Sequence, residues 1–204
     1  MNSKVIGIML ILGPILTMGI WILYSVDTEV LSPSDAMIAI LAENNKTQIG
    51  SILQIFGSIS MFTGLYLLAK SLKSDHSVSN HFAEIGGLLL LLSVPIWVVM
   101  IGSPITAIET AEEFGNDVGA TIIASSTAFE MVGFLMIIGL FMLGISLTLL
   151  RKYKGIVGIL FIITSVCGFI DMLISNEIIS IIGWMGMFLM TFVTGILITL
   201  KKEN

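Results

Sequence analysis

The sequence has few charged residues and very few side chains that could carry metal or redox chemistry. Only 11% of its 204 residues are Asp, Glu, Lys or Arg, and it contains one cysteine and two histidines. The single thiol, that of Cys167, cannot form an internal disulfide, and a cysteine-based metal site is excluded as well. The formal net charge is −5 and no basic patch is present, so binding of nucleic acid is excluded.

Sequence motifs that would indicate an enzyme are also missing. There is no nucleophile elbow, phosphate-binding loop, HExxH sequence or paired-carboxylate motif. His76 and His81 lie in a polar segment rich in Ser and Asn, whereas a zinc or copper site needs several convergent ligands. We therefore expect no metal, no cofactor and no catalysis by this chain alone.

Long hydrophobic runs dominate the chain instead. Hydrophobic residues make up 56% of it, and its mean hydropathy is +1.05. Each run supplies about 20 residues, enough to cross a hydrocarbon layer of ~30 Å at about 1.5 Å per residue. The runs are 5–24, 49–69, 82–102, 121–150, 155–174 and 178–200. They predict an all-α polytopic membrane protein with six transmembrane helices in a single domain, residues 1–204; the fourth run needs only Met131 onward to cross.

The distribution of Lys and Arg predicts which helix ends face the cytoplasm. If the N-terminus is inside, eight of the nine basic residues fall in cytoplasmic segments and only Lys46 falls outside. The eight are Lys4, Lys70, Lys73, Arg151, Lys152, Lys154, Lys201 and Lys202. Most acidic residues fall on the other side. The positive-inside rule therefore predicts a multi-pass plasma-membrane protein with both termini in the cytoplasm.

The two long outer segments share a pattern that predicts short helices. Ser32 and Pro33, and again Ser103 and Pro104, place a favourable N-cap before a proline that suits the first helical position. Apolar residues then follow on one helical face, and Gly115 is expected to end the second helix. We predict two short helices on the outer membrane surface, with ordinary ordered loops as the alternative.

Carboxylates within or beside the membrane are candidates for function because a charge is costly there. Glu84 lies at the cytoplasmic start of the third helix, where the helix dipole favours a carboxylate, and is expected to be structural. Glu130 and Asp171 are both expected near the outer ends of the fourth and fifth helices. Together they form a candidate site for a cation or for proton transfer; the alternative is that both simply reach the outer water.

Small residues give the clearest packing signal. Gly50, Gly57 and Gly64 recur every seven residues along the second helix, forming a smooth stripe that another backbone can approach closely. The fourth helix adds Gly133, Gly139 and Gly144. Such faces favour either packing within the six-helix bundle or docking of a helix from a partner subunit.

The stretches LAENN at 41–45, IGSIL at 49–53 and GLYLLAK at 64–70 carry a family resemblance. They resemble an uncharacterised family of small six-helix membrane proteins in bacteria and archaea. The resemblance implies an outer loop followed by a second helix that ends in a basic inner loop, and it brings no chemistry with it. The acidic, isoleucine-rich composition is also similar to that of marine archaeal proteins, in organisms whose copper-dependent ammonia monooxygenase has accessory membrane subunits.

The pattern as a whole predicts a non-catalytic accessory or scaffold subunit of a larger membrane complex; the archaeal resemblance implies the ammonia monooxygenase. The expected partners are membrane lipids and other membrane subunits held through the glycine-lined faces. The alternative is a small transporter of cations or solutes that uses Glu130 and Asp171. A membrane enzyme would require a bound cofactor for which the sequence shows no motif.

Overall fold

Helices make up almost all of the structure, a computed structural model that describes residues 3–26, 28, 31–72, 74–75, 77–129, 131–174 and 176–200. Six helical segments are long and apolar enough to cross a membrane. They are Ser3–Tyr24, Asn44–Ser71, Val78–Phe114, Val132–Leu149, Ile156–Ile174 and Glu177–Leu200. Large apolar side chains such as Leu23, Phe56 and Leu189 are exposed along them, which suits a lipid surround. The predicted all-helical protein with six candidate spans is confirmed.

The first and sixth spans are interrupted by π-helical turns. The first span consists of α1 (Ser3–Pro14), η1 (Ile15–Gly19) and α2 (Ile20–Tyr24), and the sixth of α9 (Glu177–Ser180), η4 (Ile181–Met185) and α10 (Gly186–Leu200). The other elements are α3 (Pro33–Ala42), α4 (Asn44–Ser71), α5 (Ser77–Phe114), α6 (Asn116–Ser126), η2 (Thr127–Phe129), α7 (Val132–Leu149), η3 (Lys152–Gly155) and α8 (Ile156–Ile174). Pro14 is the last residue of α1 and directly precedes η1.

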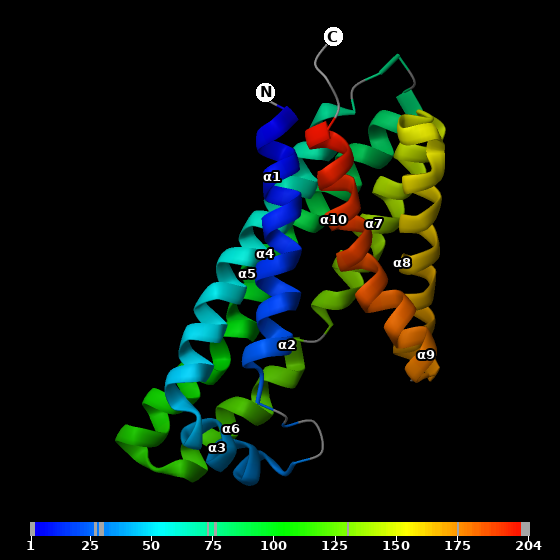
Figure 1. The fold of residues 1–204 in the computed structure, drawn as a ribbon. Helices are drawn as coiled ribbons and strands as arrows, with labels where there is room; N and C mark the ends of the chain where they lie inside the picture. Colours follow the sequence, from blue (N-terminus) through cyan, green and yellow to red (C-terminus); the bar gives the residue numbers. More distant parts are fainter. Residues whose placement is uncertain are drawn as a thin grey trace.

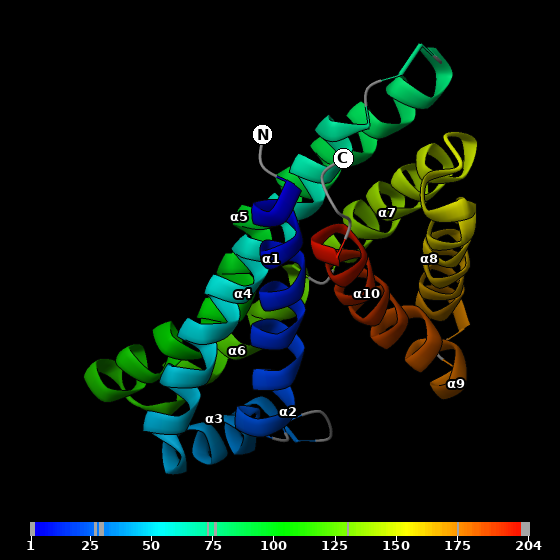
Figure 2. The same ribbon diagram turned by 45° about the horizontal axis from the view of Figure 1, so that its top comes forward.

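The six spans form a ring in which each packs against the next and the sixth packs against the first (Figure 1, Figure 2). Glycines face each other at several crossings. A Cβ atom on Gly195 of α10 would lie 2.8 Å from the carbonyl oxygen of Gly7 in α1. A Cβ atom on Gly86 of α5 would lie 2.7 Å from the carbonyl oxygen of Gly139 in α7. Because any side chain here would collide with backbone, glycine sets how closely these helices approach.

The two ends of the bundle carry opposite charge. Figure 1 shows the start of α1, the end of α10 and the turn between α7 and α8 at one end, and α3, α6, α9 and the end of α5 at the other. The first end, here called the basic end, carries Lys4, Lys70, Arg151 and Lys152, and also the acidic residues Asp75 and Glu84. The second, the acidic end, carries Asp35, Glu43, Glu109, Glu112, Glu113, Asp117 and Glu177, and also Lys46, which is paired with Glu43. Lys73, Lys201 and Lys202 lie outside the described residues. The separation is the one expected if every span crosses a membrane.

The predicted helix start at Ser103 and Pro104 is wrong. Both residues lie inside α5, which continues without a break to Phe114. A proline at position 104 cannot donate to the carbonyl of Met100, one helical turn earlier. The Ser103 hydroxyl donates to that same carbonyl oxygen at 2.8 Å. The side chain replaces the missing backbone bond, so the helix passes through the proline.

The other predicted short helix begins where the sequence predicts. The Ser32 hydroxyl accepts a hydrogen bond from the backbone N–H of Asp35 at 3.2 Å, and Pro33 is the first residue of α3. Gly115, with φ +98°, ends α5 as expected. Helices α3 and α6 and the end of α5 then share a small apolar core of their own. We call these three elements the acidic cap.

The fourth span is shorter than the predicted run 121–150. It begins at Val132, and the residues before it form α6 and the 3-10 turn η2. The apolar residues that suggested a start near Thr121 pack inside the acidic cap instead: Ala120 is buried there, and Ile122 and Ile123 pack against the same cluster.

Candidate ligand cavity

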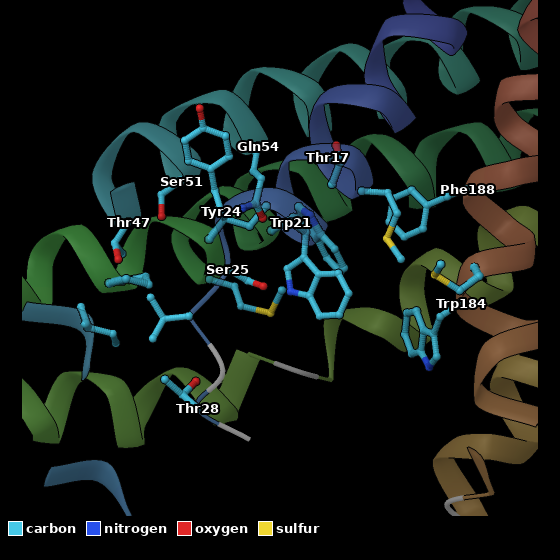
Figure 3. Close-up of a pocket in the computed structure, with 18 of the residues that line it drawn as sticks. Thr17, Trp21, Tyr24, Ser25, Thr28, Thr47, Ser51, Gln54, Trp184 and Phe188 are labelled. Carbon is cyan, nitrogen blue, oxygen red and sulfur yellow. The ribbon is translucent and has the colours of Figure 1, made fainter. Parts of the chain in front are cut away.

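A cavity of about 780 Å³ lies between the first, second, third and sixth spans (Figure 3). Its wall comes from η1, α2 and the residues that follow, from the first part of α4, from the middle of α5, and from α9, η4 and α10. Ile40 of α3 also contributes to the wall. The cavity therefore occupies the half of the bundle nearer the acidic end and reaches the underside of the acidic cap.

All three tryptophans of the chain line this cavity, although they come from three different spans. The Trp97 ring meets Phe62 edge-on, with ring centroids 5.9 Å apart. The Trp184 indole N–H donates to a carboxylate oxygen of Asp171 at 3.0 Å. These contacts orient two of the three rings, so an aromatic wall exists before any ligand enters. Trp21, on α2, completes it.

The polar groups in the wall are neutral. Thr17, Thr47, Ser51 and Gln54 contribute hydroxyl and amide groups, and Figure 3 shows them along one side of the cavity. Thr17 is already satisfied, because its hydroxyl donates to the Gly13 carbonyl at 2.9 Å. No Asp, Glu, His, Lys or Arg occurs among the lining residues in the described ranges. A wall of this kind selects against ions and favours neutral molecules.

Two polar atoms of lining residues are buried without a hydrogen-bond partner. They are the indole nitrogen of Trp97 and the hydroxyl oxygen of Thr47, which is 8% exposed. Within the part of the chain that the structure describes, the only other such side-chain atom is the hydroxyl oxygen of Ser165. An unpaired buried polar group costs about 1–3 kcal/mol. A ligand that supplied the missing partners would recover that free energy.

Both π-helical segments contribute to the cavity. Thr17 and Met18 belong to η1, and Ile181, Trp184 and Met185 belong to η4. These are the π-helices of the described residues, and they lie on the two spans that close the ring. Such turns are often found at functional sites, where they direct side chains away from the regular helical positions.

A packed floor closes the cavity toward the basic end. Phe188 lines both the cavity and a second space of about 10 Å³ among Phe62, Leu65 and Leu140. A space needs about 10–15 Å³ to hold one water. The second space is at that limit, and the residues around it other than Phe188 are almost fully buried. The cavity therefore ends at Phe188.

The predicted carboxylate pair is placed only in part. Asp171 is partly buried near the end of α8, and its carboxylate accepts the indole N–H of Trp184. It supports the cavity wall from behind but does not line the cavity. Glu130 lies outside the described residues, so the pairing of these two carboxylates stays a prediction.

The six glycines predicted to mediate helix packing all lie against other helices of the same chain. They are Gly50, Gly57, Gly64, Gly133, Gly139 and Gly144. The three on α4 face the first span; a Cβ atom on Gly57 would lie 2.6 Å from the backbone nitrogen of Thr17. The three on α7 face α5, α8 and η4, and a Cβ atom on Gly133 would lie 2.8 Å from the Trp184 ring. A partner helix would have to bind elsewhere.

Metal-ligating side chains do not gather in the described ranges. No three His, Cys, Asp or Glu residues there are placed to hold a metal ion. Cys167 is partly buried in α8, and His81 lies in the first turns of α5. His76 lies outside the described residues.

Comparisons with known proteins identify no family for this chain. No family of protein sequences, no curated protein and no solved structure matches it. The resemblance to small six-helix membrane proteins and to archaeal monooxygenase subunits therefore stays a prediction. What the chain does has to be argued from its own geometry.

Proposed function

We propose that this chain is a non-catalytic, multi-pass membrane protein that binds a small lipid-soluble molecule in the tryptophan-lined cavity. One observation carries the proposal: three tryptophans from three spans converge on one cavity whose described lining has no charged side chain. Aromatic side chains with a few neutral polar groups are the usual lining of small-molecule sites.

The size of the cavity supports this function. Ligand pockets have volumes of about 300–1,000 Å³, and the cavity measures about 780 Å³. The wall residues Trp21 and Met185 are also 45% and 39% exposed, so a molecule in the surrounding membrane can reach the cavity. We therefore expect the cavity to be occupied in the membrane.

The charge distribution suggests which side of the membrane the cavity serves. With the basic end in the cytoplasm, as the positive-inside rule requires, the cavity lies in the outer leaflet beneath the acidic cap. Both termini are then cytoplasmic, and α3 and α6 lie at the outer membrane surface. A lipid-soluble molecule would enter from the outer leaflet.

The structure gives less support to transport through the bundle than to binding of a molecule in the cavity. A transporter needs a route through the bundle, whereas the cavity ends at Phe188 above a packed core. The one candidate carboxylate that the structure places, Asp171, is hydrogen-bonded behind the wall. This arrangement favours a protein that binds a molecule in the cavity and does not pass it through the bundle.

Membership of a larger complex is a second candidate function, and the acidic cap favours it. The cap exposes Glu109, Glu113 and Asp117 beside Phe114, whose side chain is 64% exposed. An exposed aromatic residue among acids suits a basic, partly apolar surface on another subunit. Purification from native membranes in mild detergent decides the matter, because a chain that elutes alone would rule this candidate out.

A cavity-filling variant tests the binding function. Ser51 lines the cavity and is 6% exposed, whereas its neighbour Ile52 is 46% exposed and points away from the core. The probe is 1-aminoanthracene, a flat neutral molecule that accepts energy from nearby tryptophans. We expect energy transfer from the wild-type protein in detergent, a loss of at least about tenfold in affinity in Ser51→Phe, and no change in the control Ile52→Phe.

The same experiment can contradict the proposal. Equal binding by wild type and Ser51→Phe, both folded, would mean that the probe sits on the lipid-facing surface and that the cavity is not a site. If Ser51→Phe does not fold, Gln54→Phe places the same ring on the same wall from a partly buried position. The outcome is then read from that variant in the same way.

A further inference from the structure

We infer that the molecule held in the cavity carries a carbonyl-type hydrogen-bond acceptor, which the indole N–H of Trp97 binds near the floor. This inference rests on the proposed binding function and adds the chemical class of the ligand. The class is a flat, neutral, lipid-soluble ketone or related carbonyl compound with an aromatic skeleton.

Trp97 is the first step in the argument. An indole N–H can only donate, so it needs an acceptor, and Trp97 has none within the described residues. Trp184 provides the contrast, because its indole N–H is already bound to Asp171. Of these two rings in the wall, one is thus satisfied by the protein and the other is left with an unused donor.

The position of Trp97 indicates where the acceptor lies. Its ring meets Phe62, one of the fully buried residues of the core, and Phe62 borders the small space beneath the floor together with Phe188. Trp97 therefore lies on the core side of the cavity, near the floor, and its nitrogen is covered by neighbouring atoms in this structure. The polar end of the ligand points into the bundle, and its apolar body lies along Trp21, Met100 and Ile101.

The remaining wall sets the other properties of the ligand. The described lining carries no charged side chain that would balance a charge on the ligand, so a neutral molecule is favoured. Aromatic rings from several spans favour a flat molecule that can stack on them or meet their edges. The Trp97 nitrogen is buried in the wall, so its bond to the ligand forms with the side-chain adjustments that are common on binding.

A pair of matched probes tests the inference. Fluorene and 9-fluorenone have the same flat shape and differ in that fluorenone replaces a methylene group with a carbonyl. Each is used to displace 1-aminoanthracene from the purified protein in detergent. We expect fluorenone to compete about tenfold more effectively than fluorene, the difference that one buried hydrogen bond supplies.

Three variants locate the bond. In Trp97→Phe, which keeps an aromatic ring but removes the donor, we expect the ratio of fluorenone affinity to fluorene affinity to fall to about one. In Trp21→Phe the advantage should persist, which controls for the loss of an indole elsewhere in the wall. In Thr47→Val it should also persist, which controls for removal of the other unpaired polar group.

The outcomes separate this inference from the binding function on which it rests. Equal competition by the two probes, or an advantage that survives Trp97→Phe or disappears only in Thr47→Val, overturns the inference but leaves binding in the cavity intact. Failure of 1-aminoanthracene to bind the cavity overturns both. If Trp97→Phe does not fold, the infrared carbonyl band of bound fluorenone decides: the inference requires a shift to lower frequency in wild type that persists in Thr47→Val and in Gln54→Leu, and it fails if the band stays at its hydrocarbon-solvent value or the shift is lost in either variant.

Discussion

At the scale of single residues, glycines decide how closely the helices pack, but the space available for a side chain differs greatly from one glycine to another. A Cβ atom on Gly13 of α1 would lie 2.6 Å from the Cα atom of Met61 in α4, so a backbone would have to move. A Cβ atom on Gly19 would meet nothing nearer than a methyl group of Ile15 at 4.0 Å. Both glycines lie on the first span, yet only one of them lies at a close helix crossing.

This contrast predicts opposite effects of the same substitution. Gly13→Ala should lower the free energy of unfolding by about 1–3 kcal/mol, because the added methyl group forces the first two spans apart. Gly19→Ala should leave it unchanged or raise it by up to about 1 kcal/mol, because alanine favours helix. Thermal unfolding in one detergent checks both. Equal destabilisation by the two would show that the crossing at Met61 is not this tight.

At the scale of elements, the long helix α5 depends on a side chain to pass through a proline. The Ser103 hydroxyl donates to the Met100 carbonyl oxygen that Pro104 leaves without its backbone donor. The same serine and proline resemble a helix start in the sequence, because N-caps and first-turn prolines have that composition. A helix start and a helix interior differ in whether the serine hydroxyl can bond to the carbonyl of the residue three positions earlier. That depends on the folded chain and not on the residue types.

Substitutions at these two positions should therefore not be additive. Ser103→Ala is expected to lower the free energy of unfolding by about 0.5–1.5 kcal/mol, because it leaves the Met100 carbonyl unpaired. In a Pro104→Ala background the same change should cost almost nothing, since an alanine has the backbone N–H that the proline lacks. The four proteins of this cycle are compared by thermal unfolding. Additive effects would mean that Ser103 does not replace the proline's missing bond.

At the scale of the whole molecule, the separation of charge predicts its orientation. Lys152, at the basic end, and Glu113, at the acidic end, are both exposed. In a background in which Cys167→Ser removes the only thiol, Glu113→Cys should react with a membrane-impermeant maleimide in intact cells, and Lys152→Cys only after permeabilisation. The reverse pattern would mean that the acidic end faces the cytoplasm and that the cavity lies in the inner leaflet.

The sequence predicts the spans of this protein well and the cavity hardly at all. The six apolar runs could be found because each helix must satisfy its own backbone in lipid, which is a local requirement. The first N-cap, at Ser32, could be found for the same kind of reason. Trp97 and Trp184 fall inside the third and sixth apolar runs, whereas tryptophans usually gather at the membrane interface. Nothing in the sequence order shows that they face the same space as Trp21.

Composition, hydrophobic periodicity and the placement of lysine and arginine were enough for the helical class, the number of spans and the opposite charge of the two ends. Each of these depends on residues close together in the chain and on the solvent around them. The cavity, the unpaired indole of Trp97 and the unbroken α5 were decided by the tertiary structure. The cavity and the unpaired indole depend on how the first, second, third and sixth spans come together, and the unbroken α5 depends on a hydroxyl that reaches one particular carbonyl. Such contacts between or within folded helices are not visible in the order of residues.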